Sequence, residues 1–78
     1  MARRNRMDIY VDILNAAREG AKKTHLVYQA NLNFKIVKGY LEKLTEVGFL
    51  KKTGKFFVTT PKGSQFIDQY KDISILAT

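Results

Sequence analysis

The chain has 78 residues, enough for one small domain with a modest hydrophobic core. Its 14 lysine and arginine residues outnumber 7 aspartate and glutamate residues, and the net charge of +7 favours a polyanionic partner such as nucleic acid. Without cysteine the chain can form neither disulfide bonds nor thiolate metal sites, and no apolar run is long enough for a membrane span or a signal core. We therefore expect a cytoplasmic protein that makes no membrane contact.

The first part of the chain combines a basic arm, at residues 1–6, with an amphipathic helix. The arm carries three arginines, Arg3, Arg4 and Arg6. Such an arm could reach a DNA minor groove, and a solubilising tail is the alternative. Apolar residues at helical spacing predict the helix over residues 7–18, and Gly20 ends it. A short extended segment at residues 21–23 could add an edge strand to a sheet.

Two helices joined by a tight turn are predicted next, over residues 24–30 and 33–47. Thr24 and Asn33 are suited to cap their starts, and Gly48 is suited to end the second helix in the left-handed conformation. The second helix carries an apolar stripe that we expect to face the core, made of Phe34, Val37, Leu41 and Leu44 and widened by Ile36, Tyr40 and Val47. A short helix, a turn and a longer helix with exposed lysines are typical of a helix-turn-helix.

The segment after Gly48 has the alternation of a β-hairpin, with strands predicted at residues 49–52 and 55–59 and a two-residue turn at Thr53–Gly54. The expected cross-strand pairs are Lys52 with Lys55, Leu50 with Phe57, and Phe49 with Val58. We expect one face to meet the helices and the other to point away: Leu50, Phe57 and Thr59 on the first, and Phe49, Phe56 and Val58 on the second. A slip of one residue would reverse the two faces.

A last helix is predicted over residues 61–75, because Thr60 offers a capping hydroxyl and Pro61 suits the first helical position. Gly63 is expected to weaken its first turn modestly. The fold class is therefore α+β, mainly α, with one domain at residues 7–78 behind the arm. Three helices, a hairpin wing and a C-terminal helix make a winged helix-turn-helix.

Three segments carry a closer resemblance: GAKKTHLVYQANLNF, KGYLEKLTEVGFL and TTPKG. Over about residues 7–72 the chain resembles the small archaeal winged-helix DNA-binding proteins, the ArnR-like and Sulfolobus 10a type regulators. The resemblance implies a homodimer that binds double-stranded DNA and pairs its long C-terminal helices as an antiparallel coiled coil. In this chain the last helix is expected to be shorter, about two heptads. The candidate dimer interface consists of Phe66, Tyr70 and Ile73.

The second helix of a helix-turn-helix lies in the major groove, where its N-terminal residues approach base edges. The candidates here are Asn33, Lys35, Lys38, Gly39 and Glu42. Lysine can donate to guanine and glutamate can accept from cytosine, whereas an ordinary solvated face is the alternative. Glycine within a helix costs about 1 kcal/mol relative to alanine, so close approach of DNA or of a neighbouring helix could explain Gly39.

Further candidates flank this helix. Thr24 and His25 could bind a phosphate at a helix N-terminus, although a cap or plain exposure explains them as well. Three lysines surround the hairpin turn and could follow phosphates or enter the minor groove: Lys51, Lys52 and Lys55. The alternative is that these lysines blunt an exposed sheet edge.

The residue pattern argues against catalysis, because it contains no nucleophile paired with a base, no carboxylate cluster and no phosphate-binding loop. We expect no enzyme activity, no cofactor and no metal. The leading hypothesis is a sequence-specific transcriptional regulator of archaeal or archaeal-viral type. The alternatives are a low-specificity, chromatin-like DNA binder and a winged-helix module that binds proteins.

Overall fold

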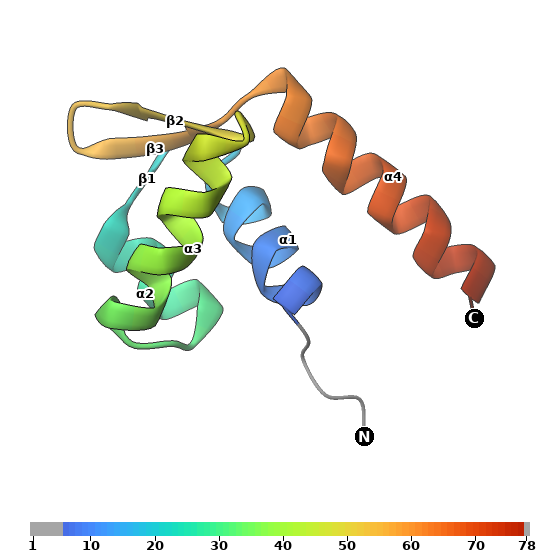
Figure 1. The fold of residues 1–78 in the computed structure, drawn as a ribbon, viewed down its shortest axis with the longest axis horizontal. Helices are drawn as coiled ribbons and strands as arrows, with labels where there is room; N and C mark the ends of the chain where they lie inside the picture. Colours follow the sequence, from blue (N-terminus) through green and yellow to red (C-terminus); the bar gives the residue numbers. More distant parts are fainter. Residues whose placement is uncertain (1–5, 78) are drawn as a thin grey trace.

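The computed structural model describes the backbone of residues 6–77 and the side chains of residues 6–70. Its elements follow in the order α1 (Arg6–Ala16), β1 (Ala21–Lys22), α2 (Lys23–Ala30), α3 (Phe34–Glu46), β2 (Leu50–Thr53), β3 (Phe56–Thr59) and α4 (Pro61–Ala77). Figure 1 shows α2 and α3 on one side of α1 and α4 on the other, with the β2–β3 hairpin projecting as a wing. This is the expected mainly α architecture, and no helix in the described range is long and apolar enough to cross a membrane.

The boundaries of the first helix differ from those predicted. The helix covers Arg6–Ala16, whereas residues 7–18 were expected. Arg6 is therefore the exposed first residue of α1 and not part of the arm, and Arg18 lies in the turn that follows the helix. In this turn the Arg18 N–H donates to the Asn15 carbonyl, and the Arg18 Nε donates to the Asn15 side chain.

The sheet is antiparallel, with β3 between β1 and β2. The anticipated edge strand forms at Ala21–Lys22, and Ala21 pairs with Phe57. Because β1 leads directly into α2, this pairing ties the start of α2 to the wing. The wing is therefore a three-stranded structure and not an isolated hairpin.

The predicted hairpin register is wrong by two residues. The turn is Gly54–Lys55, and the observed pairs are Thr53 with Phe56, Lys52 with Phe57, Lys51 with Val58, and Leu50 with Thr59. Gly54 has φ of 60° and Lys55 does not share a positive φ, which suits a turn with glycine at its first central position. A shift of two residues leaves the side chains of the paired strand residues on their expected faces, so Leu50 and Thr59 are buried and Phe56 is exposed.

Phe49 was expected on the outer face of the sheet, but it does not lie there. It precedes β2, and its ring stacks on that of Phe66 in α4, with 4.9 Å between the ring centroids. The chain between α3 and β2 therefore carries Phe49 to the C-terminal helix. This contact joins α4 to the wing end of the domain.

The core lies between the helices and the inner face of the sheet, and α3 contributes Val37, Leu41 and Leu44 to it. Phe34 and Ile36 were expected to belong to the same stripe, but they are 52% and 45% exposed. Both lie in the first turn of α3, on either side of the buried stripe, where the rest of the described chain does not cover them. The first turn of α3 therefore presents apolar side chains to solvent.

The turn between α2 and α3 is defined by two asparagines. Asn31 adopts the left-handed conformation with φ of 54°, and its N–H donates to the carbonyl of Tyr28. The Asn33 side chain accepts from the N–H of Ile36 at 2.8 Å, which confirms the predicted cap. Gly48, with φ of 86°, also follows the α3 C-terminus as predicted. Thr24 is not a cap, because α2 begins one residue earlier and the cap position falls on Lys22.

The start of α4 is held by the Thr60 cap. The hydroxyl of Thr60 accepts from the Gly63 N–H at 3.1 Å and donates to the Gly48 carbonyl at 2.6 Å. Gly63 does more than weaken the first turn, since a Cβ atom there would collide with the Phe49 carbonyl and would lie 2.8 Å from the Thr59 methyl. Glycine is required where α4 leaves the sheet because the two chain segments touch.

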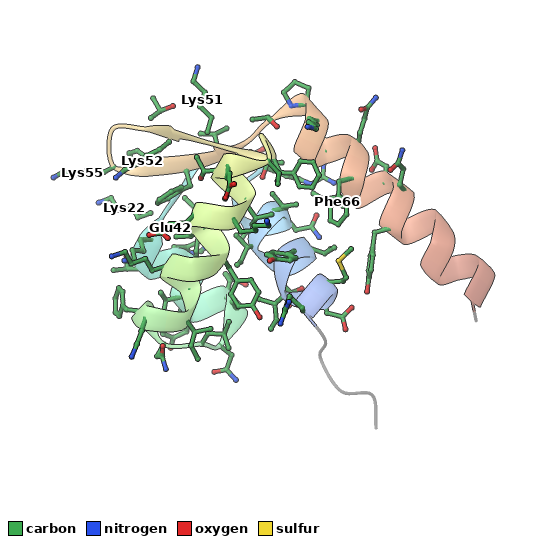
Figure 2. The ribbon with its side chains drawn as sticks, viewed as in Figure 1. Lys22, Glu42, Lys51, Lys52, Lys55 and Phe66 are labelled. Atoms are coloured by element: carbon green, nitrogen blue, oxygen red, sulfur yellow. The ribbon has the colours of Figure 1, made fainter. Side chains whose placement is uncertain are left out.

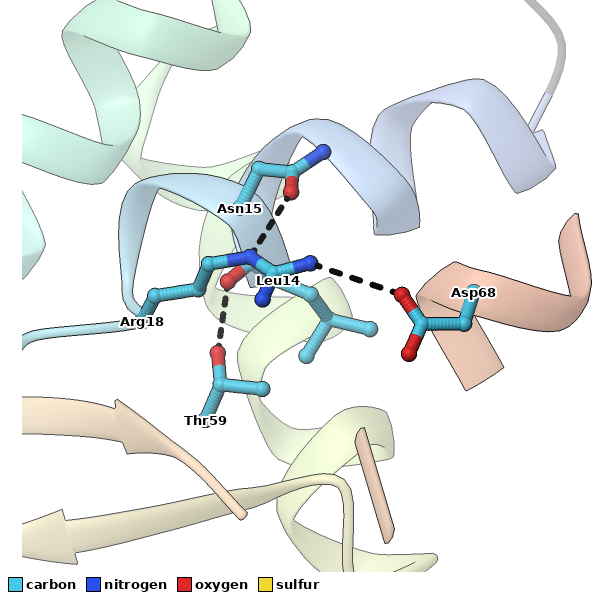
Figure 3. Close-up of polar contacts among 5 residues, drawn as sticks. All are labelled: Leu14, Asn15, Arg18, Thr59 and Asp68. Carbon is cyan, nitrogen blue, oxygen red and sulfur yellow. Dashed lines mark hydrogen bonds and ion pairs between the residues drawn. The ribbon is translucent and has the colours of Figure 1, made fainter. Parts of the chain in front are cut away.

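Polar contacts connect α1 with β3, and the turn after α1 with α4 (Figure 3). The buried Thr59 hydroxyl donates to the Leu14 carbonyl at 2.6 Å. Arg18 lies 4.0 Å from Asp68, a pair too exposed to contribute much stability. Further along α4, the Tyr70 hydroxyl donates to the Asp8 carboxylate. The first half of α4 is thus attached to the body of the domain.

Candidate nucleic-acid interface

A groove of about 630 Å³ runs between α3 and the inner face of the wing. Leu41 and Phe57 supply apolar side chains to its lining. Four lysines surround this apolar strip: Lys23, Lys38, Lys52 and Lys55. Two glutamates of α3, Glu42 and Glu46, also line it, so the four positive and two negative charges leave a net charge of +2. The groove thus joins a basic wing to a helix of mixed charge.

All five candidates on α3 or at its cap are exposed, namely Asn33, Lys35, Lys38, Gly39 and Glu42. A Cβ atom built on Gly39 would meet no atom within 4 Å, so packing inside the described chain gives no reason for this glycine. Of the two reasons considered for Gly39, contact with a neighbouring helix of the same chain is therefore excluded. Close approach of an external partner is the other reason that could explain glycine at position 39.

The register divides the three wing lysines between different surfaces. Lys52 pairs with Phe57 on the inner face and borders the groove together with Lys55 in the turn. Lys51 pairs with Val58 on the outer face, and Figure 2 shows it pointing away from Glu42 and α3. The wing can therefore offer positive charge at its tip and on both faces.

Several lysines of this region lie over aromatic rings. The Lys52 Nζ is 5.8 Å from the centre of the Phe57 ring, and the Lys22 Nζ is 5.9 Å from that of Phe56. Such contacts contribute about 0.5–1 kcal/mol at exposed sites, so their main effect is to restrict where the ammonium groups lie. The restriction keeps part of the positive charge next to the wing.

The remaining candidates lie away from the groove or outside the described chain. His25 is exposed and borders a separate depression between α1 and α2, together with Asp12, Asn15 and Gln29. Thr24 is exposed in the first turn of α2. Arg3 and Arg4 lie outside the described residues. Nothing in the described structure brings Thr24 or His25 to the same surface as Lys38 and Lys52.

Sequence reasoning did not include Lys22 and Lys23 among the candidates, although Lys23 lines the groove and the Lys22 Nζ lies over the Phe56 ring of the wing. Their place depends on the pairing of β1 with β3, which brings the start of α2 beside the wing. The signal was present, since both lysines belong to the segment at residues 21–23 that was anticipated as an edge strand. The exposure of Phe34 and Ile36 was also not predicted. Helical periodicity alone cannot reveal which end of a stripe is left uncovered.

Two of the three candidate dimer residues make contacts within their own chain. Phe66 stacks on Phe49, and Tyr70 is hydrogen-bonded to Asp8. This hydrogen bond and the negative charge beside it raise the pKa of Tyr70 above its ordinary value of 10.0. Both side chains keep part of their surface exposed. Ile73 lies outside the residues whose side chains are described.

The described residues contain no group of three or more His, Cys, Asp or Glu side chains that could hold a metal ion. What the region offers is an exposed helix face, a basic wing and a groove between them. Residues 3–78 match a family model described as Winged helix-turn-helix. The chain belongs to the winged helix-turn-helix family. This membership supports the expectation that it is not an enzyme.

Among relatives of this winged helix-turn-helix protein are two proteins of Methanocaldococcus jannaschii. The uncharacterized protein MJ0290 is 31% identical over 72 residues, which cover 91% of this chain and 34% of that protein. The uncharacterized protein MJ0287 is 31% identical over 64 residues, which cover 81% of this chain and 66% of that protein. The chain thus spans about a third of the first relative and just under two thirds of the second.

A solved structure with the same fold is that of Sso10a-2, a DNA-binding protein from Sulfolobus solfataricus. It superimposes with a TM-score of 0.82 and 26% sequence identity, and the match covers 95% of this chain and 82% of that chain. The expected resemblance to archaeal winged-helix DNA-binding proteins is therefore confirmed, including the α+β fold class with its C-terminal helix.

Proposed function

We propose that this winged helix-turn-helix protein binds double-stranded DNA as a sequence-specific transcriptional regulator of archaeal or archaeal-viral type. Helix α3 would enter the major groove, and the wing lysines Lys51, Lys52 and Lys55 would contact the backbone or the minor groove. The observation that carries the proposal is the exposed face of α3, which adjoins a groove bordered by four lysines. The major groove is about 12 Å wide and admits an α-helix, so the helix and the wing could bind together.

Charge on α3 favours reading of bases over simple attraction to phosphates. Lys35 and Lys38 are exposed on the first half of the helix and can donate to guanine. Glu42 is exposed one turn further on, where a carboxylate would repel phosphates but could accept from a cytosine amino group. A chromatin-like binder that relies only on phosphates would gain nothing from this glutamate. Sequence-specific binding is thus the better-supported of the two DNA-binding hypotheses.

A homodimer paired through α4 completes the proposal. The helix has 17 residues, rather more than two heptads, and Figure 1 shows it extending away from α3 and the wing. The exposed parts of Phe66 and Tyr70, together with Ile73, would contribute to the pairing. A symmetric dimer would match a pseudo-palindromic site with half-sites about one helical turn apart. Measurement of the solution mass over a range of concentrations tests this step, and a mass that stays monomeric at all concentrations contradicts it.

DNA affinity measured against salt and competitor DNA separates the candidate functions. If six lysine or arginine side chains contact phosphates, log K should fall against log salt with a slope of about −5. A regulator should prefer its selected sequence about a thousandfold or more over bulk DNA, whereas a chromatin-like binder should show little preference. Absence of DNA affinity at low salt would contradict the proposal and favour the alternative, a winged-helix module that binds proteins.

A further inference from the structure

Two large apolar side chains stand exposed at the start of α3. Phe34 is 52% exposed and Ile36 is 45% exposed, although the rest of the apolar stripe is covered. Single exposed apolar residues are common, but these two share one helical turn with the exposed Lys35 between them. Successive helical residues point about 100° apart, so Phe34 and Ile36 flank Lys35 on the helix surface.

The first turn of α3 is held in a defined conformation. The Asn33 side chain caps this turn by accepting a hydrogen bond from the Ile36 N–H, and the next residue, Val37, is buried in the core. The Lys23 Nζ lies 5.7 Å from the centre of the Phe34 ring, so one face of the ring is next to a positive charge. Apolar side chains on opposite sides of an exposed lysine, with further lysines nearby, are suited to a partner that carries both negative charge and small apolar groups.

We infer that Phe34 and Ile36 read thymine, by packing against its C5-methyl groups in the major groove on either side of the base pair that Lys35 contacts. This inference rests on the proposed DNA binding and specifies what α3 would recognise. The thymine methyl is an apolar group on a base edge in the major groove, and apolar side chains are its usual partners. The recognised half-site therefore contains T·A pairs next to the pair that Lys35 reads.

A second copy of this chain fits the pair poorly. The exposed parts of the two side chains offer on the order of 200 Å², since a fully buried aromatic side chain contributes 150–250 Å². A stable protein interface needs about 800 Å² from each partner. The neighbouring Lys23, Lys35 and Lys38 would also repel an equally basic copy with its net charge of +7. DNA carries the complementary charge.

The test uses a duplex selected by the wild-type chain from a random-sequence pool, together with a copy in which deoxyuridine replaces thymidine. Uracil lacks only the C5-methyl group. Burial of one methyl is worth about 0.8 kcal/mol, so each contacted thymine should change the affinity about fourfold. The ratio of the affinities for the thymidine and deoxyuridine duplexes should fall in the variants Phe34→Ala and Ile36→Ala. The double variant should bind the two duplexes equally. Because both side chains are exposed, the variants should fold, which circular dichroism checks.

Tyr28→Ala is the matched control, since it removes an exposed aromatic side chain from α2 instead of α3. This variant should keep the thymine preference of the wild type. The inference is wrong if selection does not enrich thymine, if wild type binds the two duplexes equally, or if the double variant keeps the preference. In those cases DNA binding itself stands. Failure to bind either duplex at low salt removes the proposed function and the inference with it.

Discussion

The backbone of Gly63 lies directly against the carbonyl of Phe49. A side chain at Gly63 would collide with that oxygen and would bring a Cβ atom 2.8 Å from the Thr59 methyl. The same Phe49 carbonyl accepts a hydrogen bond from the Thr60 N–H at 3.0 Å. The residue before β2 and the residue before α4 therefore cannot separate without losing this hydrogen bond. This contact fixes where α4 leaves the sheet.

Replacement Gly63→Ala should therefore destabilise the domain. Inserting a methyl group into a tightly packed site typically costs about 1–3 kcal/mol, and here the obstacle is backbone and not a flexible side chain. The free energy of unfolding from denaturant titration measures the effect. A neutral or stabilising result would show that α4 can shift easily away from Phe49.

Gly39→Ala is predicted to have opposite effects on stability and on DNA affinity. A Cβ atom at this position meets nothing in the described chain, so the variant should gain up to about 1 kcal/mol from helix propensity. If the α3 backbone approaches DNA closely here, the added methyl should lower the affinity for the selected duplex. Parallel denaturant and DNA titrations separate the two effects. Equal DNA affinity in the two proteins would remove Gly39 from the interface.

The buried Thr59 hydroxyl provides a test of the connection between β3 and α1. Thr59→Val keeps the shape but leaves the Leu14 carbonyl without this donor, which should cost about 1–3 kcal/mol. Thr59→Ser retains the hydroxyl and serves as the control for the hydrogen bond, at the expense of one methyl group. The comparison of unfolding free energies should rank wild type first. If valine is as stable as threonine, the hydrogen bond contributes nothing net.

Attachment of α4 to α1 should depend on pH through Tyr70. Its pKa is raised because the protonated hydroxyl donates to Asp8, so this contact stabilises the fold below about pH 10 and is lost as the pH rises through the raised pKa. Tyr70→Phe should therefore lower the melting temperature at neutral pH. The difference between the variant and wild type should disappear in strongly alkaline buffer. A difference that does not change with pH would mean that packing, and not the hydrogen bond, is responsible.

Local patterns were enough to predict the element boundaries to within two residues. The Asn33 cap, the left-handed Gly48 and the Thr60 cap each depend on side chains and backbone within a few residues, which the sequence displays directly. The hairpin register was not determined locally, because Thr53–Gly54 and Gly54–Lys55 both place glycine in a two-residue turn. Only the pairing of the whole strands distinguishes them.

Properties that depend on distant segments could not be predicted. The need for glycine at Gly63 arises from the path of Phe49, and the exposure of Phe34 depends on how far the neighbouring elements reach along α3. In the candidate interface, the exposure of Lys35 and Lys38 agrees with the periodicity of α3. The place of Lys23 beside the groove depends on the pairing of β1 with β3, which the sequence suggested only as one possibility.

A DNA titration of the double variant Lys35→Ala/Lys38→Ala tests the central claim most directly. Its control is Arg18→Gln/Lys62→Gln, which removes the same charge from two exposed positions, Arg18 in the turn after α1 and Lys62 in the first turn of α4. At physiological ionic strength charges farther than about 8 Å are screened, so loss of charge at a distance should have a small effect. We predict at least about a tenfold loss of affinity for the selected duplex in the α3 variant, with unchanged folding, since a good base contact is worth about 1–3 kcal/mol. Equal affinities in the α3 variant and its control would contradict the assignment of α3 as the recognition helix.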